Sequence, residues 1–546
     1  MGAGKHRLDL SGNPEYELRE TKGADIDPSG NDSAAEEPDA VGRIDTRLGD
    51  LSRGLECASV IFKEKNEISR RQLGALIAKE RKIAVLESRL ARTEAVLNKI
   101  FRASFRMEPI SAGRRPLTLD TPISVIIPVR NGGENIRGML GKIRSQKKVR
   151  DVEIIVIDSG STDSTVAIAE GFGCRVIRIP EREFNHGATR NLGAREARGE
   201  FLVFTVQDAL PASDYWLYAM VSPFVAYPEL AALSSKQLVR QEADLFSLWM
   251  NEAIYKSIGF MEDSIYGLTP SFDFSDWKHF DGQVKRQLSF FDNVCSCVRK
   301  SVFDEIRFTP QINAEDIDFG VRLLEKRKKI GFLTTTGVYH WHERGPEYVL
   351  KRHFIGTKAT LYIMKNDLSY SFNDHRIDLQ SLVANILSLH DLVTVAIPEE
   401  NSNGTGLLEV ATAFVSSMSR YINASPNEIS AALSAKTQTR GEGFKPQLLD
   451  LFGDAVPAPG EYADCRKNFL IPKFMTDFGH LVDFLSTRQF TVAERERDLI
   501  SCIYKIFAAT VGDALGIYYL EAETLDQLTD DLKRMDRVLA KGVCYF

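Results

Sequence analysis

The stretch Glu200-Phe-Leu-Val-Phe-Thr-Val-Gln-Asp-Ala-Leu-Pro211 decides the fold of the central part of this chain. Its apolar run has the length of a strand, ends in the carboxylate of Asp208 and is followed by a turn residue, Pro211. This pattern is typical of a buried strand that delivers an acid to the carboxyl edge of a sheet, where open α/β folds bind ligands. We therefore predict a ligand site around Asp208.

Short apolar runs near this strand alternate with longer mixed segments, which indicates βαβ units and an α/β fold. The predicted strands cover residues 124–128, 153–158, 175–179 and 201–206. A helix is expected over 162–170, with Ser161 or Thr162 as its N-cap.

The 546 residues are too many for one hydrophobic core. We predict a disordered polar segment over 1–42, a helical hairpin or coiled coil over 43–107, an α/β domain over 108–362 and a mainly helical domain over 363–546. Leu76, Ile83, Leu90 and Leu97 recur every seven residues. This stripe can support self-association as a homo-oligomer, or it can dock on the chain's own domain.

Composition narrows the function and the location. A net charge of −6 argues against a general nucleic-acid binder, which would need clustered Lys and Arg. No uninterrupted apolar run approaches the roughly 18–20 residues that cross a bilayer, and the N-terminus lacks the apolar core of a signal peptide. The seven cysteines have no metal-ligand spacing. We expect a cytoplasmic protein.

Two downstream motifs supply groups for catalysis. Glu315 and Asp316 are adjacent acids before a helix-like segment, and both are predicted to be catalytic. Helix capping accounts for one of them, and Asp316 is our choice of general base. His340 and His342 alternate in Val338-Tyr-His-Trp-His342, so on a strand both imidazoles would face the same side. Together with Asp208 they are candidate ligands of Mg²⁺ or Mn²⁺, although isolated strand histidines are more often structural.

A nucleotide pocket is expected beside the first two strands. Asp158 ends the second strand and can accept from a base or a ribose hydroxyl, while Gly160 permits close backbone approach. Its alternative role is to cap the next helix. The segment Pro128-Val-Arg130-Asn131 would form the other wall. Arg190 can hold base or phosphate, or it can be a solvated helix residue.

Seven segments in order resemble family 2 glycosyltransferases. They are Val125-Ile-Ile-Pro-Val-Arg-Asn131, Ile157-Asp-Ser-Gly-Ser-Thr-Asp163, Phe184-Asn-His-Gly-Ala-Thr-Arg-Asn-Leu-Gly193, Val206-Gln-Asp-Ala-Leu-Pro211, residues 291–303, Ala314-Glu-Asp316 and Val338-Tyr-His-Trp-His342. The Gln-Asp-Ala-Leu-Pro form, together with Asn-His-Gly, is most similar to bacterial rhamnosyltransferases that build surface polysaccharide.

This resemblance spans about residues 121–360 and implies an inverting enzyme. Its GT-A domain would hold a mostly parallel mixed sheet flanked by helices. Asp158 and Arg190 would bind nucleotide, Asp208 and His340 would serve a divalent metal or the diphosphate, and Asp316 would act as base. The family's usual Asp-x-Asp is here Gln207-Asp208-Ala209, so one carboxylate stands where two are common. Gln207 is then expected to contact the nucleotide sugar.

The resemblance also implies a reaction. We expect transfer of a sugar, rhamnose from dTDP-rhamnose or a hexose from its UDP derivative, to a hydroxyl of a growing surface glycan. The acceptor can be lipid-linked, with the protein peripheral at the inner face of the membrane. The alternative is a non-catalytic scaffold built on a lapsed GT-A domain, which would show no metal-linked nucleotide binding.

Overall fold

The computed structural model describes residues 105–541, apart from 112–114, 261, 281, 311–312, 365–377, 399–405, 441–443, 459–464, 489 and 491–495. The predictions of a disordered segment over 1–42 and of a helical hairpin or coiled coil that mediates self-association lie outside the described residues, except at 105–107. Those three residues belong to strand β1, Phe105–Pro109, so the helical prediction is wrong there. Antiparallel pairing with a distant strand decides their conformation.

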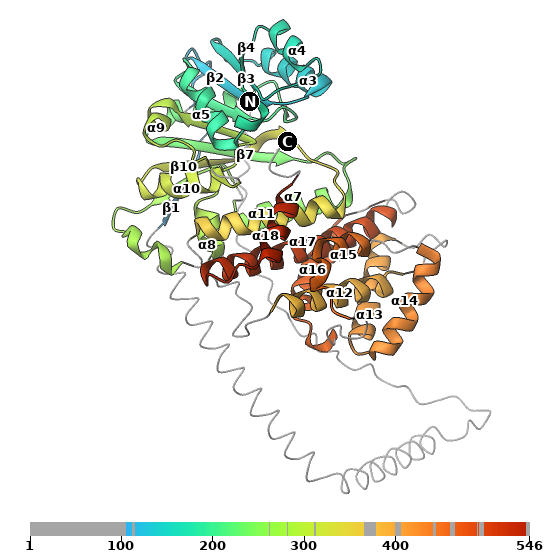
Figure 1. Cartoon of the computed structure of the whole chain (residues 1–546). Coiled ribbons are helices and arrows are strands. Elements are labelled where there is room, and N and C mark those ends of the chain that lie inside the picture. Colours follow the sequence, from blue (N-terminus) through green and yellow to red (C-terminus); the bar gives the residue numbers. More distant parts are fainter. Residues whose placement is uncertain are drawn as a thin grey trace, which may run out of the picture. The chain divides into compact units, whose positions relative to one another are not determined.

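The described residues contain one 10-stranded sheet in the order β1-β8-β10-β7-β9-β5-β2-β3-β4, with β6 paired to β10 (Figure 1). The other strands are β2 Ile123–Val129, β3 Val152–Asp158, β4 Arg175–Arg178, β5 Phe201–Thr205, β6 Leu210–Pro211, β7 Leu230–Leu238, β8 Ser264–Leu268, β9 Cys295–Arg299 and β10 Lys329–Tyr339. The four strands predicted from apolar runs correspond to β2, β3, β4 and β5.

Parallel pairing is confined to two blocks of this sheet. The first block is β4-β3-β2-β5, and the second is the pair β7 and β10. Strand β9 lies between the blocks and is antiparallel to both β5 and β7. Strands β2, β3, β5, β7 and β10 therefore all point the same way, and their carboxyl ends meet at one edge. The predicted mixed sheet flanked by helices is confirmed.

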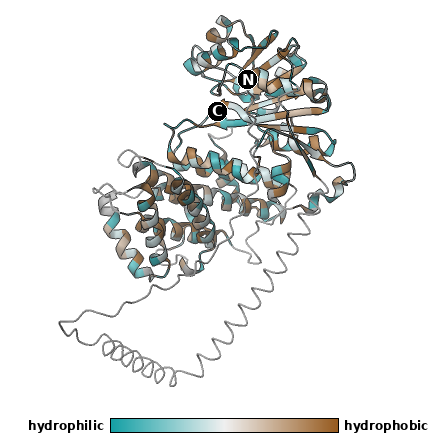
Figure 2. Ribbon diagram, turned by 180° about the vertical axis from the view of Figure 1, so that it is seen from behind, coloured by the Kyte–Doolittle hydropathy of each residue, from teal (hydrophilic) through white to brown (hydrophobic). Residues whose placement is uncertain are grey.

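Apolar cores cover both faces of the sheet, which explains the continuous apolar runs in its strands. Val125 and Ile127 of β2 pack in one core, whereas Ile126 packs in the other. The ribbon in Figure 2, coloured by hydropathy, shows hydrophobic positions along the strands of the sheet. The helices of this part are α3 Gly133–Arg144, α4 Thr165–Gly171, α5 His186–Glu196, α6 Trp216–Ala226, α7 Leu245–Ile258, α8 Gly282–Leu288, α9 Lys300–Glu305 and α10 Glu315–Glu325.

The N-cap of α4 differs from the prediction. The cap is Ser164, not Ser161 or Thr162. Both predicted caps are instead bonded to Asn131. Thr162 N–H donates to Asn131 Oδ1 at 2.8 Å, and Asn131 N–H donates to Ser161 Oγ at 2.9 Å. A contact across about thirty residues thus overrides the local signal.

The C-terminal part is helical, as predicted. Its helices are α11 Pro346–Ile363, α12 Leu379–Ala396, α13 Leu407–Ile422, α14 Pro426–Arg440, α15 Lys445–Phe452, α16 Leu470–Ser486, α17 Glu496–Thr524 and α18 Asp530–Ala540. Their apolar core also includes residues of α7 and α11. A Cβ at Gly516 of α17 would lie 2.9 Å from the carbonyl oxygen of Phe354, so α11 and α17 pack in close contact. The predicted boundary at 362 therefore falls inside this core.

Within the described residues, two helical windows are long and apolar enough to cross a membrane by length and composition. They are Leu379–Ala396 and Asp498–Thr524. The protein itself buries 72% of the first window and 78% of the second. The first window belongs to α12 and the second to α17, and both helices contribute to the helical core. A helix buried in a core is also expected to be apolar.

Candidate active site

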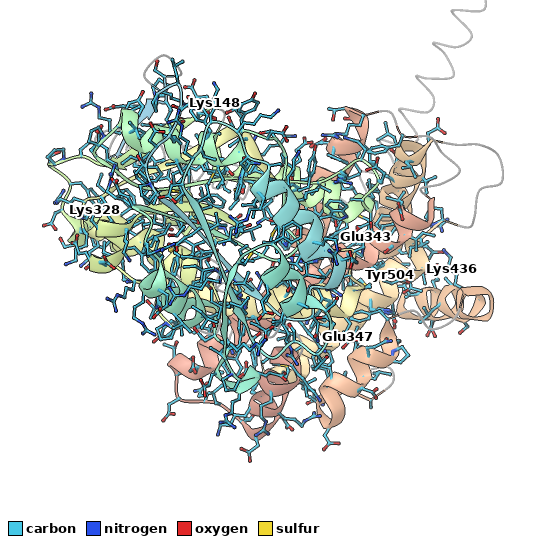
Figure 3. The ribbon with its side chains drawn as sticks, turned by 90° about the horizontal axis from the view of Figure 1, so that it is seen from above. Lys148, Lys328, Glu343, Glu347, Lys436 and Tyr504 are labelled. Atoms are coloured by element: carbon cyan, nitrogen blue, oxygen red, sulfur yellow. The ribbon has the colours of Figure 1, made fainter. Side chains whose placement is uncertain are left out.

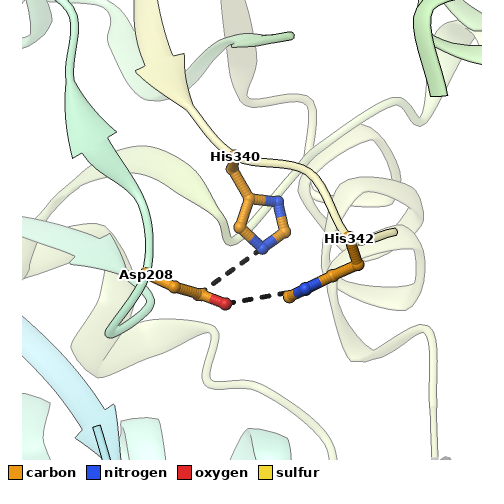
Figure 4. A group of neighbouring side chains, drawn as sticks. All are labelled: Asp208, His340 and His342. Carbon is orange, nitrogen blue, oxygen red and sulfur yellow. Dashed lines mark ion pairs between the residues drawn. The ribbon is translucent and has the colours of Figure 1, made fainter. Parts of the chain in front are cut away.

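Asp208, His340 and His342 converge at the carboxyl edge of the sheet. Asp208 lies in the turn after β5, and His340 directly follows β10, with its N–H donating to the carbonyl of Leu238 at 3.0 Å. His340 Nε2 is 3.6 Å from Asp208 Oδ1, and His342 Nε2 is 3.7 Å from Oδ2 (Figure 4). Strand β10 ends at Tyr339, so the two histidines lie beyond the strand, yet both imidazoles face the same carboxylate.

The chemistry of this group fits a divalent cation. Burial lowers the pKa of His340 to about 4 and also lowers that of His342, against the opposing charge of Asp208. Both imidazoles are therefore neutral at neutral pH and carry a lone pair. The three ligand atoms, one each from Asp208, His340 and His342, lie within 4.8 Å of one another. The two imidazole nitrogens are nevertheless beyond hydrogen-bond distance of the Asp208 carboxylate. One carboxylate oxygen and two imidazole nitrogens form a ligand set that a divalent cation can occupy.

The predicted acid pair lies inside a helix, whereas the sequence suggested that it precedes one. Helix α10 begins at Glu315, so both acids occupy its first turn, where the helix dipole favours negative charge. The N-cap, Ala314, has a φ of 63°. A left-handed alanine is uncommon, which is why local sequence rules place the start of this helix too late.

Glu315 is a buried ion-pair partner. Its Oε1 accepts from Arg190 Nη1 at 3.1 Å and from Asn293 Nδ2 at 3.2 Å. Burial alone would raise the pKa of Glu315, but Arg190 and His186 hold it below its usual value. A buried, ion-paired carboxylate whose pKa is lowered is a poor proton acceptor, so this geometry supports positioning more than the catalytic role predicted for Glu315.

Asp316 has the properties that Glu315 lacks. Burial, with the nearby charges of Glu315 and Asp292, raises the pKa of Asp316 to about 7. Its side chain remains partly exposed, and its Oδ1 accepts from the N–H of Ile317 at 2.9 Å. A carboxylate that titrates near neutrality is matched to general base catalysis.

Asp158 stabilises the turn after β3. Its carboxylate accepts from Gly160 N–H at 3.3 Å and from Ser161 N–H at 3.2 Å, and the side chain is buried. Gly160 has a φ of 90°, a conformation that favours glycine. The alternative in which Asp158 caps α4 is wrong, and contact with a nucleotide stays a prediction.

Gln207 links the end of β5 to the end of β2. Its Oε1 accepts from Arg130 N–H at 2.8 Å, and its Nε2 donates to Arg130 O at 3.1 Å. The Arg130 side chain forms an ion pair with Glu181 at 2.6 Å, and Pro128 is buried within β2. A carboxylate at position 207 could not donate to Arg130 O. The amide therefore gives a physical reason for Gln207 in place of an acid.

Arg190 is buried, so the alternative of a solvated helix residue is wrong. One Nη1 donates to both Glu315 and the carbonyl of His186, at 3.1 Å each. This ion pair joins α5, beside the parallel block, to α10. Binding of base or phosphate by Arg190 stays a prediction.

Sequence reasoning missed three residues of this edge. Gln237 of β7 lies 2.7 Å from His340 Nδ1, and its Nε2 donates to Asp292 Oδ2 at 2.6 Å. Arg352 of α11 donates to Asn313 Oδ1 at 2.9 Å, close in sequence to the acid pair. Gln237 is a polar residue that follows the buried run of β7, and this sequence pattern could have identified it. Figure 3 labels Glu343 and Glu347 on either side of the start of α11.

The metal-ligand candidates and the acid pair belong to one network. Asp292 accepts from Gln237, the neighbour of His340, and its charge also raises the pKa of Asp316. Arg352 disfavours the protonated forms of both His340 and His342. The structure therefore brings Asp208 to the two histidines, more than a hundred residues away in sequence, and links His340 to Asp316 through Gln237 and Asp292.

Comparison with known proteins identifies the α/β part. Residues 124–307 match the family model for glycosyl transferase family 2. The O-antigen chain rhamnosyltransferase RfbN of Salmonella typhimurium is 28% identical over 236 residues, 42% of this chain and 70% of that protein. WbaN of Salmonella anatum, also an O-antigen chain rhamnosyltransferase, is 26% identical over 234 residues, with the same coverage.

A solved structure with a similar path is the mannosyltransferase PcManGT from Pyrobaculum calidifontis, with a TM-score of 0.36 and 14% identity. The alignment covers 68% of this chain and 88% of that one. The family match falls on the strands and helices that carry Asp158, Arg190 and Asp208. The chain thus contains a family 2 glycosyltransferase domain of the GT-A fold that resembles the rhamnosyltransferases of O-antigen synthesis.

Proposed function

We propose that the protein is an inverting glycosyltransferase that moves rhamnose from dTDP-rhamnose, or a hexose from its UDP derivative, to a hydroxyl of a growing surface glycan. The observation that carries this proposal is the cluster of Asp208 with two neutral imidazoles, linked to Asp316 through Gln237 and Asp292. Burial and the charges of Glu315 and Asp292 raise the pKa of Asp316 to about 7, and Asp208, His340 and His342 form a group that could hold a divalent cation.

Asp316 is the general base of the proposed reaction. The acceptor hydroxyl oxygen attacks the anomeric carbon from the face opposite the nucleoside diphosphate, and the bond from that carbon to the diphosphate oxygen breaks. The hydroxyl proton passes to the Asp316 carboxylate. Configuration at the anomeric carbon is thereby inverted, and the products are the extended glycan and a nucleoside diphosphate. The partial exposure of Asp316 leaves room for the acceptor.

Asp208, His340 and His342 are the residues that would hold Mn²⁺ or Mg²⁺. When bound, such a cation neutralises the charge that develops on the departing diphosphate. Both imidazoles are neutral at neutral pH and face the Asp208 carboxylate, so their lone pairs are available to ligate a cation.

The nucleotide would lie over the ends of β2 and β3. Asp158, Gly160, Asn131 and the Gln207–Arg130 pair form this wall, and all are fixed by hydrogen bonds or turns that involve the backbone. Because this wall is already held in place, nucleotide binding would require little further ordering of the protein. The similarity to O-antigen rhamnosyltransferases supports dTDP-rhamnose as the first donor to test. It also supports a lipid-linked acceptor, reached by a cytoplasmic protein at the inner face of the membrane.

A transfer assay tests this proposal. Purified full-length protein is incubated with dTDP-rhamnose, UDP-glucose or UDP-galactose, a rhamnose-containing oligosaccharide acceptor and Mn²⁺. We expect release of nucleoside diphosphate, and NMR of the glycan should show the opposite anomeric configuration to that of the donor. EDTA should abolish transfer. Retention of configuration would overturn the base assignment, and no transfer from any donor would overturn the proposal.

A further inference from the structure

Gln237 occupies a fixed position behind His340. It lies on β7 opposite Val338 of β10, and its backbone N–H donates to the hydroxyl of Tyr255 at 2.6 Å. Asn251 Nδ2 donates to its carbonyl at 2.9 Å. The backbone of Gln237 is therefore held on both sides, and only its amide group faces His340 and Asp292.

The orientation of this amide is set by Asp292. A carboxylate oxygen accepts and does not donate, so the group that faces Asp292 Oδ2 at 2.6 Å is the NH₂ of Gln237. The amide oxygen then faces His340 Nδ1 at 2.7 Å. Because that oxygen only accepts, Nδ1 carries the proton. The lone pair of the neutral ring is left on Nε2, the atom that faces Asp208.

We propose that Gln237 and Asp292 are positioning residues that hold His340 in the Nδ1–H tautomer and aim its Nε2 at the metal site. This inference rests on the proposed function, because it assigns the cation to Asp208 and the two histidines. Outer partners of metal-ligating histidines fix ring orientation and tautomer in this way. His342 has no such partner among the described contacts, so the two histidines are not equivalent.

Asp292 also links the metal site to the base. Its Oδ2 accepts from Gln237 and its Oδ1 accepts from Val294 N–H at 2.9 Å, so both oxygens are occupied and the carboxylate cannot turn. Its charge acts on Asp316. One buried carboxylate therefore orients the histidine through Gln237 and sets the electrostatic environment of the base.

The first test measures Mn²⁺ binding to Gln237→Met by calorimetry. Methionine keeps the length of the side chain and removes the amide. We expect Mn²⁺ binding to weaken by about 10–100-fold, with little change in unfolding temperature. The matched control repeats this substitution in His340→Ala, where Gln237 has no ligand to position. There it should leave the remaining Mn²⁺ affinity unchanged.

The second test uses Asp292→Asn and serves if Gln237→Met fails to fold. The asparagine oxygen retains the bond from Val294, so its NH₂ faces Gln237 and turns the Gln237 amide over. The NH₂ of Gln237 then faces His340 and drives the proton to Nε2. Nitrogen-15 NMR of histidine-labelled metal-free protein distinguishes the tautomers, and His340→Ala identifies the signal among the nine histidines.

The outcomes separate this inference from the proposed function. Weaker Mn²⁺ binding in Gln237→Met and the Nε2–H tautomer in Asp292→Asn support it. Wild-type Mn²⁺ affinity in Gln237→Met, or an unchanged tautomer in Asp292→Asn, overturns the inference and leaves the glycosyltransferase proposal standing. A wild-type protein that binds no Mn²⁺ overturns both the inference and the metal site of the proposed function.

Discussion

Two groups of polar side chains at the carboxyl edge of the sheet differ in how they are held. In the locked group, Asp158, Asn131 and Gln207 all bond to backbone groups of neighbouring turns or strands. In the reactive group, Asp208 of the turn after β5 faces two imidazoles that follow β10 beyond hydrogen-bond distance, and Asp316 of α10 has a raised pKa. The first group is fixed by local hydrogen bonds, whereas the second contains the groups that could ligate a metal or accept a proton. We infer that the locked group binds the donor and the reactive group performs the chemistry.

The largest expected effect is on Asp316, in the reactive group. Asp316→Asn removes the proton acceptor, and turnover should fall by about 100- to 10,000-fold, the usual range for a general base. The fold should survive. In the folded protein the pKa of Asp316 is about 7, whereas in the unfolded chain it is near the ordinary aspartate value. Ionisation of Asp316 therefore destabilises the fold as pH rises between these two values. Asparagine avoids that cost. Steady-state transfer kinetics check the prediction.

Asp318→Asn is the matched control on the same helix. The Asp318 carboxylate binds Thr309 and Arg322 and has no place in the proposed chemistry. Its replacement should lower stability and leave turnover per folded molecule near the wild-type value. Equal losses of turnover in the two variants would contradict the distinction between them.

Arg190 joins α5 to α10 through its ion pair with Glu315 and should have the next largest effect. Arg190→Met leaves the buried Glu315 carboxylate without its cation, and a broken buried pair costs about 3–5 kcal/mol of unfolding free energy. Urea unfolding measures this loss. Arg195→Met, an exposed arginine on the same helix, should change stability far less. A stable Arg190→Met that binds nucleotide weakly would instead favour the nucleotide-binding role.

The pH dependence of transfer sharpens the assignment of the base. Burial, with Glu315 and Asp292, raises the pKa of Asp316 to about 7, and the base works only when ionised. The kcat/KM value should therefore rise about tenfold per pH unit below this value and level off above it. Asp292→Asn removes one of the charges that raise the pKa, so the midpoint should move to lower pH. A midpoint that stays in place would assign the titration to another group.

The smallest expected effect is on Gln207, in the locked group. Gln207→Met removes two hydrogen bonds to Arg130 and should cost about 1–3 kcal/mol of stability. Nucleotide affinity should fall modestly, because the wall loosens but keeps its groups. Gln207→Glu keeps the acceptor for Arg130 N–H and should lie between wild type and Gln207→Met. A loss of turnover as large as that of Asp316→Asn would contradict the passive role of this residue.

Local patterns sufficed for the elements that carry most of the site. The apolar runs before Asp158 and Asp208 identified β3 and β5, and the order of the strands brings their carboxyl ends to the same edge. The convergence of His340, His342 and Asp208 follows from β10 running in the same direction as β5. These positions were predictable because an acid or imidazole directly after a buried strand lies at the carboxyl edge of the sheet, where open α/β folds bind ligands.

The remaining features depend on contacts between distant segments. Gln237 reaches both His340 and Asp292 because β7 lies between β9 and β10, an order that no local pattern encodes. The true N-cap of α4 follows from Asn131, and the early start of α10 follows from the left-handed backbone at Ala314. Strand β1 was missed because its five residues alternate weakly and owe their extended form to β8.

Metal-linked nucleotide binding tests the central claim most directly. Calorimetric titration of dTDP, and then of UDP, into the full-length protein with and without Mn²⁺ engages the locked wall and the Asp208 site together. We expect one of the two nucleotides to bind and to bind measurably tighter with Mn²⁺, and Asp208→Ala should remove that difference. Equal affinity with and without Mn²⁺, or no binding of either nucleotide, would contradict the account and favour a non-catalytic scaffold.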